Sequence, residues 1–355
     1  MYLPAMRYQL SFLAIFLYFH SIAQIHTLGG KSISKEKMDQ FVQHELDSLH
    51  LMGLSIAVVN DGKVVYHHAV GLANVYTQEK MTDRTMFEFA SMGKSVFAFF
   101  VMRLVDEHIL SLDTPLYKYM PYPDIAYDNR YQLITARMVL DHTTGFPNWR
   151  DGDSLKILFT PGTKWSYSGE GYEYLAKVIE HLTNHTRRNL DSLFTQEVAI
   201  PLNMEHTHYS INPYIARHLA VGHVGDTVTY EPSDKFSFSP AGGLYSDPLD
   251  FTNFLIGVMD GKILSKAGYD EMLRQQVRLD STARQSHVGD TGWGLGFAIG
   301  PTAYGNEYSH GGNNWGYTGF FMLNREKRFG FVVLTNSDQM NAIKGDFSEF
   351  LEKGE

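Results

Sequence analysis

A tight β-hairpin is predicted near the amino-terminal end of this 355-residue chain. Residues 54–59 and 63–67 are rich in valine and other apolar side chains, and Asn60-Asp61-Gly62 lies between them. Asp-Gly supplies the positive φ angles that a short connection between antiparallel strands needs. An amphipathic helix is predicted just before the hairpin, over residues 38–46.

A second group of strands is predicted close to the carboxyl end. These segments are residues 294–299, 305–310, 317–323 and 329–335, with the polar residues 324–327 as the turn between the last two. Strands at both ends of a chain, with helices between them, predict one antiparallel sheet built from both chain ends and flanked by helices. We therefore expect an α+β fold.

Helical patterns and long loops dominate the middle of the chain. The clearest predicted helices are residues 95–107, 136–142 and 171–182. The domain organisation that follows is a sheet subdomain with an inserted, mainly helical subdomain. The predicted bounds are residues 31–80 plus 258–355 for the sheet subdomain and 81–257 for the helical one.

Composition excludes several classes of function. The hydrophobic content of 44% fits a folded globular protein, and a net charge of -9 with no long basic run gives no sign of nucleic-acid binding. The chain has no cysteine, so disulfides, thiolate metal sites and a cysteine nucleophile are excluded.

Residues 1–23 have the features of a signal peptide. Arg7 precedes an apolar run over residues 12–19, and Ser21 and Ala23 suit cleavage after Ala23. The run is short for a membrane span, and without a cysteine no lipoprotein anchor is available. The sequence therefore predicts export to the periplasm or secretion; the alternative is a buried amino-terminal helix.

Ser91 and Lys94 form the most informative pair of polar residues. They are three residues apart, where a polar segment becomes an apolar helical run, so the hydroxyl and the amine share a helix face. A serine becomes a nucleophile when a nearby base takes its proton. A lysine acts as that base when burial and the positive end of a helix lower its pKa. The pair predicts acyl transfer, although this spacing also occurs by chance.

A second cluster of polar residues surrounds Tyr167. This tyrosine sits among small residues of the segment 164–172, which predicts an accessible phenol. A nearby lysine ammonium can lower the pKa of a tyrosine and let it relay protons to a leaving group. The alternative is a loop tyrosine packed on Trp165.

The third cluster is the segment 308–316, which contains Ser309-His310-Gly311-Gly312-Asn313. A strand followed by glycines presents backbone N–H groups that can hold a carbonyl oxygen as it gains charge. His310 would add a donor that is neutral or cationic near physiological pH. The alternative is a glycine-rich hairpin connection.

Together, the three clusters resemble in order and spacing the motifs of the serine β-lactamase and penicillin-binding-protein superfamily. The branch that looks most similar contains class C β-lactamases, DD-peptidases, D-aminopeptidases and esterases. Further similar segments are residues 138–147, 240–246 and 292–296. The resemblance covers residues 54–335, and it implies one β-lactamase/transpeptidase-like catalytic unit.

The resemblance also implies roles for the site residues. Ser91 would be the acylated nucleophile, Lys94 its base, and Tyr167 the first residue of the family's Tyr-x-Asn element. His310-Gly311-Gly312 would stand in the place of Lys-Thr-Gly. The backbone N–H groups of Ser91 and Asn313 would then form the oxyanion hole.

Two departures from the family pattern bear on the substrate. Gly169 replaces the asparagine of Tyr-x-Asn, so an amide that would bind the substrate is missing, and Glu170 beside it would contact substrate or Lys94. His310 replaces a lysine that usually pairs with a carboxylate, and a neutral imidazole holds an anion less well than an ammonium. Because His-x-Gly variants occur among the family's aminopeptidases and esterases, the histidine favours these activities over a β-lactamase, whereas the missing asparagine keeps a non-turnover binding protein open.

Metal chemistry is not predicted, although the chain has 16 histidines. The pairs His181 with His185 and His206 with His208 have no obvious third ligand and no His-Glu-x-x-His pattern. Asp141-His142 resembles a triad fragment, but in the similar family this segment positions loops, so a structural role is expected.

The sequence thus predicts an exported serine hydrolase that forms an acyl-enzyme on Ser91. Its substrates would be small esters or D-amino-acid amides and peptides, with no metal or cofactor. The sequence predicts neither a nucleic-acid partner nor a membrane span after signal cleavage, and it leaves the oligomeric state open. Two alternatives remain, a non-turnover penicillin- or peptidoglycan-binding sensor on the same fold and a class C-like β-lactamase.

Overall fold

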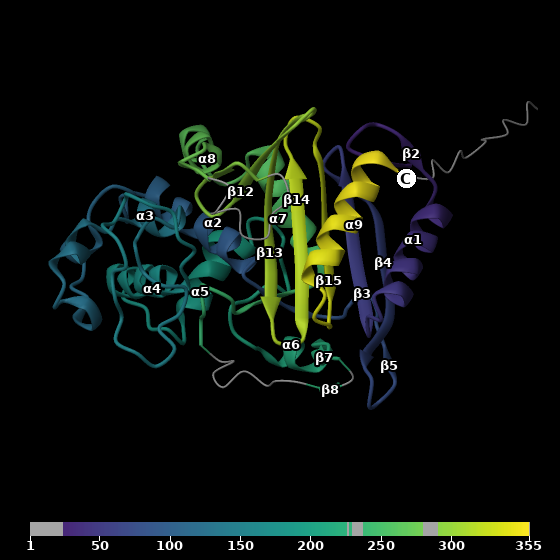
Figure 1. Ribbon diagram of the computed structural model, residues 1–355, viewed down its shortest axis with the longest axis horizontal. Helices are drawn as coiled ribbons and strands as arrows, with labels where there is room; N and C mark the ends of the chain where they lie inside the picture. The colour runs from purple at the N-terminus through teal and green to yellow at the C-terminus, as the bar shows by residue number, and fades with distance from the viewer. Residues whose placement is uncertain (1–23, 226, 229–236, 280–289, 355) are drawn as a thin grey trace, which may run out of the picture.

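The computed structural model describes residues 24–225, 227–228, 237–279 and 290–354 of the chain. Among these residues, nine strands form one sheet in the order β10-β11-β12-β13-β14-β15-β3-β4-β5, and every neighbouring pair is antiparallel (Figure 1). The strands are β3 (Gly53–Asn60), β4 (Lys63–Asn74), β5 (Glu79–Lys80), β10 (Val277–Arg278), β11 (Gly292–Trp293), β12 (Ala298–Thr302), β13 (Gly305–Asn314), β14 (Tyr317–Asn324) and β15 (Phe329–Thr335).

The two ends of the chain meet in the middle of this sheet. β15 pairs with β3 from Phe329 opposite Asn60 to Thr335 opposite Leu54. The prediction of an antiparallel sheet built from both chain ends and flanked by helices is therefore confirmed. Six shorter strands form separate pairs: β1 (Ile25–His26) with β2 (Ser32–Ile33), β6 (Phe87–Ala90) with β9 (Leu244–Ser246), and β7 (His223–Val224) with β8 (Thr227–Val228).

The predicted hairpin is present as β3 and β4. Asp61 and Gly62 in its turn have φ angles of 50° and 71°, the positive values that the Asp-Gly pair predicts. The strand predicted over residues 294–299 is wrong over residues 294–297, because the chain turns between β11 and β12. Gly296 causes this turn: its φ is 84°, and a Cβ there would lie 2.4 Å from the Cβ of Ala98.

Helices cover both faces of the sheet (Figure 1). Alternate residues of β3 explain the two layers: Ile56 and Val58 join the core under α1 and α9, whereas Ala57 and Val59 join the core that contains α2 and α7. The helices are α1 (Lys35–Ser48), α2 (Gly93–Asp106), α3 (Ala136–Leu140), α4 (Gly169–Thr183), α5 (Leu190–Phe194), α6 (Pro213–His218), α7 (Pro248–Asp260), α8 (Lys266–Leu273) and α9 (Met340–Lys353).

The segment between β6 and β9 carries α2 to α6, and α3 and α4 lie to one side of the sheet (Figure 1). In its described part, the same segment also contains four short helices that are not α-helical. Three are 3-10 helices, η1 (Leu116–Lys118), η2 (Pro123–Ile125) and η3 (Asn129–Leu133), and the fourth is the π-helix η4 (Thr195–Ala199). The boundary suggested at residue 257 falls inside α7, which packs on β3 and β15. The signal peptide expected at residues 1–23 lies outside the described residues.

Within the described ranges, none of the helices combines the length and the apolar character that crossing a membrane requires.

Candidate active site

Ser91 lies in the turn between β6 and α2. The pairing of β6 with β9 shifts register between Glu88 and Ala90, and Ala90 has a φ of 48°, in the left-handed region. Such a conformation costs a non-glycine residue roughly 1–3 kcal/mol and occurs often at functional sites. It ends the strand abruptly, so that Ser91 is half-buried while residues 92–100 are buried. The helix itself begins at Gly93, two residues after the serine.

Lys94 stands in the first turn of α2, and its side chain turns back to Ser91. Its Nζ donates a hydrogen bond to the Ser91 Oγ at 3.1 Å and another to the carbonyl oxygen of Ala241. The Lys94 side chain is 1% exposed, and its Nζ lies 4.8 Å from the ring centre of Tyr167 and 5.7 Å from that of Tyr172. The serine and the lysine that the sequence brings together are therefore in direct contact.

Burial changes the charge of this lysine. It lowers the pKa of Lys94 from 10.5 to about 7, and the nearby Glu173 carboxylate opposes that shift. Near neutral pH a large fraction of the amine is therefore unprotonated and can accept a proton. A neutral amine in hydrogen-bond contact with a serine hydroxyl has the geometry and the protonation state that a general base needs.

Tyr167 is less accessible than its small neighbours predict. It lies just before α4, and its ring packs 4.3 Å from the His142 ring and 6.2 Å from the Trp293 ring. The hydroxyl oxygen is buried. The prediction of a lowered pKa is wrong: burial raises the pKa of Tyr167 well above its usual value, and the Ser91 hydroxyl offsets this only in part. Tyr167 thus stays protonated and can donate its proton.

His142 belongs to the same ring cluster, a position that the sequence did not indicate. It is fully buried, and its Nδ1 accepts a hydrogen bond of 3.1 Å from the backbone N–H of Ser168. Asp141 instead accepts from the backbone and the hydroxyl of Thr143. Because the carboxylate does not orient the imidazole, no Asp-His dyad forms here. Burial and the nearby Lys94 hold the pKa of His142 well below its usual value.

His310, Gly311, Gly312 and Asn313 all lie within β13. The expectation that the strand ends before the glycines is wrong, because pairing with β14 continues to Asn314. Gly312 is required by close packing: a Cβ there would lie 2.3 Å from the carbonyl oxygen of Phe89. The missing side chain lets β13 lie directly against β6, two residues before Ser91, and Asn313 is exposed beside this contact.

The His310 side chain is buried beside the tyrosine. Its Nδ1 donates a 2.6 Å hydrogen bond to the carbonyl oxygen of Gly311, since a carbonyl can only accept. Its ring lies 6.0 Å from that of Tyr167 and 5.5 Å from that of Trp293. The imidazole is thus part of the wall around Tyr167.

Gly169 is covered by a tryptophan. A Cβ at this position would lie 2.7 Å from the ring of Trp149 and 3.0 Å from the carbonyl oxygen of Asn148. An asparagine side chain could not occupy this space without moving the indole. The loss of the family's asparagine is therefore coupled to Trp149, which fills its place.

Glu170 does not contact Lys94, contrary to the expectation from sequence. Both of its carboxylate oxygens accept hydrogen bonds from Arg150, the shortest from Nη2 at 2.7 Å. The acidic residue whose field reaches Lys94 is Glu173, one turn further along α4. Glu173 also pairs with Arg187 at 3.0 Å. Glu173 is three residues after Glu170 on α4, and no local pattern indicates which of the two acids acts on the lysine.

Two hollows border this group of residues. The larger, about 990 Å³, is lined by Tyr167, Trp165 and Asn148 together with residues of β10. The smaller, about 650 Å³, is lined by Glu88, Trp149, Asn313, Asn314 and Trp315. Each hollow thus includes one of the residues predicted for the site, Tyr167 in the larger and Asn313 in the smaller.

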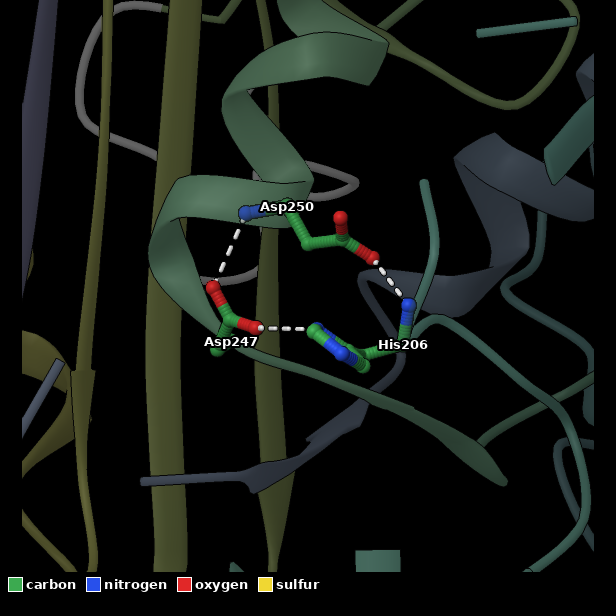
Figure 2. A group of neighbouring side chains, drawn as sticks. All are labelled: His206, Asp247 and Asp250. Atoms are coloured by element: carbon green, nitrogen blue, oxygen red, sulfur yellow. Dashed lines mark hydrogen bonds and ion pairs between the residues drawn. The ribbon is translucent and has the colours of Figure 1, made fainter. Parts of the chain in front are cut away.

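A cluster that could hold a metal lies elsewhere. In the described part of the chain, ligand atoms of His206, Asp247 and Asp250 come within 4.8 Å of one another (Figure 2). The sequence suggested that His206 and His208 form a pair. In the structure, His208 instead contacts Asp191 at 2.9 Å. His206 thus has two potential co-ligands, where the sequence indicated none.

The carboxylates of this cluster already have structural partners. Asp247 caps the start of α7 by accepting from the backbone N–H of Asp250 at 2.9 Å. Asp250 accepts from the backbone N–H groups of Glu205 and His206 and from the Thr207 hydroxyl. The cluster therefore ties the loop between η4 and α6 to the start of helix α7.

The family of the chain is clear from its sequence. A family model described as Beta-lactamase matches residues 38–348, so the chain belongs to the β-lactamase family. Its α/β architecture with a large antiparallel sheet is the β-lactamase/transpeptidase-like fold.

Individual relatives are distant. Protein flp of Staphylococcus aureus (strain COL) is 24% identical over 327 residues, which cover 85% of this chain and 63% of flp. The chain thus spans less than two thirds of that relative. Esterase EstB of Burkholderia gladioli is 26% identical, and the match covers 85% of this chain and 90% of EstB. The octameric penicillin-binding protein homologue from Pyrococcus abyssi superimposes with a TM-score of 0.77 at 23% identity, covering 91% of this chain and 78% of the homologue.

Proposed function

We propose that this chain is a serine acyl hydrolase that forms an acyl-enzyme on Ser91. The observation that carries the proposal is the buried Lys94 amine, which lies 3.1 Å from the Ser91 Oγ and has a pKa of about 7. Membership of a family with hydrolase relatives supports the same conclusion. The reaction needs no metal or organic cofactor.

In the first half-reaction, neutral Lys94 takes the proton of the Ser91 hydroxyl as the oxygen attacks the substrate carbonyl. The backbone N–H groups of Ser91 and Asn313 stabilise the tetrahedral oxyanion. Tyr167, held protonated by burial, donates its proton to the leaving alcohol or amine and regains one from Lys94. The scissile bond breaks, and the acyl group remains on Ser91.

In the second half-reaction, water attacks the acyl-enzyme carbonyl. Neutral Lys94 accepts the proton of that water as it adds, and it then gives this proton to the Ser91 oxygen as Ser91 leaves as the alcohol. The acid is released, and the free serine and neutral lysine are regenerated. His142, His310 and Trp293 enclose Tyr167 and keep its ring in one position.

The substrates that we propose are small esters and D-amino-acid amides or peptides. The match to an esterase over 90% of its length supports the ester reading. A β-lactam is disfavoured, because Trp149 replaces the amide at Gly169 and a histidine replaces the carboxylate-binding lysine at position 310. We also propose that the chain is exported after cleavage behind Ala23.

Covalent labelling tests this proposal. The protein is exposed briefly to a fluorophosphonate and, separately, to a penicillin; intact mass is measured, the modified peptide is mapped, and p-nitrophenyl butyrate turnover is followed. We expect the fluorophosphonate on Ser91, ester turnover, and neither in the Ser91→Ala variant. Unchanged turnover in that variant would refute the mechanism, and a penicillin adduct that persists without turnover would favour a sensor instead.

A further inference from the structure

The smaller hollow beside the site has an unusual polar group at its wall. Glu88 lies in β6, three residues before Ser91, and only 5% of it is exposed. Its Oε1 accepts a hydrogen bond from the Asn314 side chain, whereas its Oε2 has no hydrogen-bond partner in the described part of the chain. A buried carboxyl oxygen without a partner is costly, so it calls for an explanation in a folded protein.

The rest of the hollow also favours a positive charge. The side-chain amide nitrogen of Asn314 donates to Glu88 and to the carbonyl oxygen of Gly242 at 3.1 Å. Both of its protons are therefore used, and the amide can offer only its oxygen to a ligand. Oxygen acceptors near an acidic side chain suit an ammonium group, which has donors and no acceptor.

Two tryptophans complete the hollow. Trp149 is 46% exposed and Trp315 is 70% exposed, so both indoles present surface to a ligand. The face of an indole attracts an ammonium or alkylammonium group, and the attraction adds to that of a carboxylate.

Burial also makes the charge of Glu88 responsive to a ligand. It raises the pKa of Glu88 to about 7, and the hydrogen bond from Asn314 opposes the shift. A cation placed in the hollow would favour the ionised carboxylate, because opposite charges at close range stabilise each other.

We propose that the hollow formed by Glu88, Trp149, Asn314 and Trp315 is a subsite for a positively charged amine of the substrate, with Glu88 as its counter-ion. This inference rests on the proposed function, since it takes Ser91 as the reacting group. Asn313 lines the hollow and stands next to Gly312 on the strand beside Ser91. The substrate class is then an ester or amide that carries an ammonium group a few bonds from its scissile carbonyl.

Binding of a non-reacting probe tests the subsite without turnover. The dissociation constant of n-butylammonium is measured by tryptophan fluorescence and compared with that of 1-butanol, in the full-length protein and in Ser91→Ala. We expect both proteins to bind the ammonium at least about tenfold more tightly than the alcohol. Glu88→Gln and Trp315→Ala should each lose that preference, whereas Glu79→Gln, which removes an exposed carboxylate on β5, should keep it.

Kinetics with matched esters then connect the subsite to the reaction. In the first pair, butyrylthiocholine and its neutral 3,3-dimethylbutyl thioester analogue, the charge is in the leaving group. In the second pair, p-nitrophenyl 6-aminohexanoate and p-nitrophenyl heptanoate, the charge is in the acyl group. We expect a higher kcat/KM for the charged member of at least one pair, and a ratio about tenfold lower in Glu88→Gln. Trp315→Ala, an exposed position that cannot disturb the core, should lower the same ratio.

The two proposals fail in different ways. Equal affinity for n-butylammonium and 1-butanol, or an ammonium preference that survives in both Glu88→Gln and Trp315→Ala, would overturn the subsite whatever the enzyme hydrolyses. Normal turnover by Ser91→Ala would overturn the nucleophile, while the binding comparison would still stand on its own.

Discussion

Replacing Gly312 by alanine is a direct test of how closely β13 must lie against β6. The added Cβ would stand 2.3 Å from the carbonyl oxygen of Phe89, whereas ordinary van der Waals contact begins at 3.4 Å. The strand must therefore move outward by about 1.1 Å, which carries Asn313 away from Ser91. Neighbouring atoms leave little room to adapt, since the same Cβ would lie 3.2 Å from the Cβ of Ala90.

A displacement of this size has a measurable cost. Misplacing a catalytic group by about 1 Å can reduce the rate on the order of 100-fold, which is about 2.7 kcal/mol of transition-state stabilisation. Overpacking of this kind also destabilises a fold by roughly 1–3 kcal/mol. We therefore expect Gly312→Ala to remain folded at moderate temperature but to lose most of its kcat for p-nitrophenyl butyrate.

The assay pairs steady-state kinetics with thermal unfolding. Gly345→Ala is the matched control, because nothing lies within 4 Å of a Cβ at that position of α9 and alanine favours a helix. That control should keep its kcat and unfold at the same or a slightly higher temperature. If Gly312→Ala is folded and its kcat falls by less than about twofold, the argument that β13 supplies a precisely placed oxyanion donor is refuted.

Three further predictions concern the lysine, the tryptophan and the buried ion pair. Activity should increase with pH up to about 7 and level off above it, because only the neutral Lys94 amine accepts the serine proton. Below pH 7 the rate should drop about tenfold per pH unit, and a pH–rate profile that stays flat from pH 5 to 8 would contradict this. Gly169→Asn should impair folding or activity, because its Cβ would lie 2.7 Å from the Trp149 ring. Adding Trp149→Ala should recover at least about 1 kcal/mol of stability in a double-mutant cycle, and strictly additive effects of the two substitutions would contradict this. Glu170→Gln should lower the free energy of unfolding by about 2 kcal/mol in urea titrations. This is less than the roughly 3–5 kcal/mol lost when a fully buried ion pair is broken, because the Arg150 side chain reaches solvent. An unchanged urea midpoint would show that the Arg150–Glu170 pair contributes nothing to stability.

Local sequence patterns predict those parts of the site that lie close together along the chain. Ser91 and Lys94 are three residues apart, so a single turn fixes their contact, and the structure has that contact. The Asp61-Gly62 turn is similarly local. By contrast, the turn at Gly296 depends on the close approach of Ala98 from α2, which no local pattern contains. A strand pattern there was therefore misleading.

The protonation states of the site could not be predicted from the sequence. The pKa of Tyr167 depends on how fully distant segments enclose it, and the rings around it come from His142, Trp293 and His310. The sequence indicated that Lys94 lies near Tyr167, but not how deeply the Tyr167 hydroxyl is buried. For the same reason, the sequence indicated Glu170 and not Glu173, because the acid that acts on Lys94 follows from the rotation of α4 and from the position of Arg150.

The pairing of β15 with β3 has a consequence for how the protein acquires its structure. The Thr335 hydroxyl donates to the carbonyl oxygen of Gly53 across 282 residues of chain, so β3 has no partner on that side until synthesis is almost complete. Pairing at such sequence separation makes folding slow and leaves a strand edge open to association in the meantime. Since β13 also arrives late, a nascent or truncated chain has Ser91 and Lys94 but lacks Asn313, the second oxyanion donor that we propose. Hydrolytic activity should therefore emerge only with the finished sheet, which makes turnover itself a reporter of complete folding.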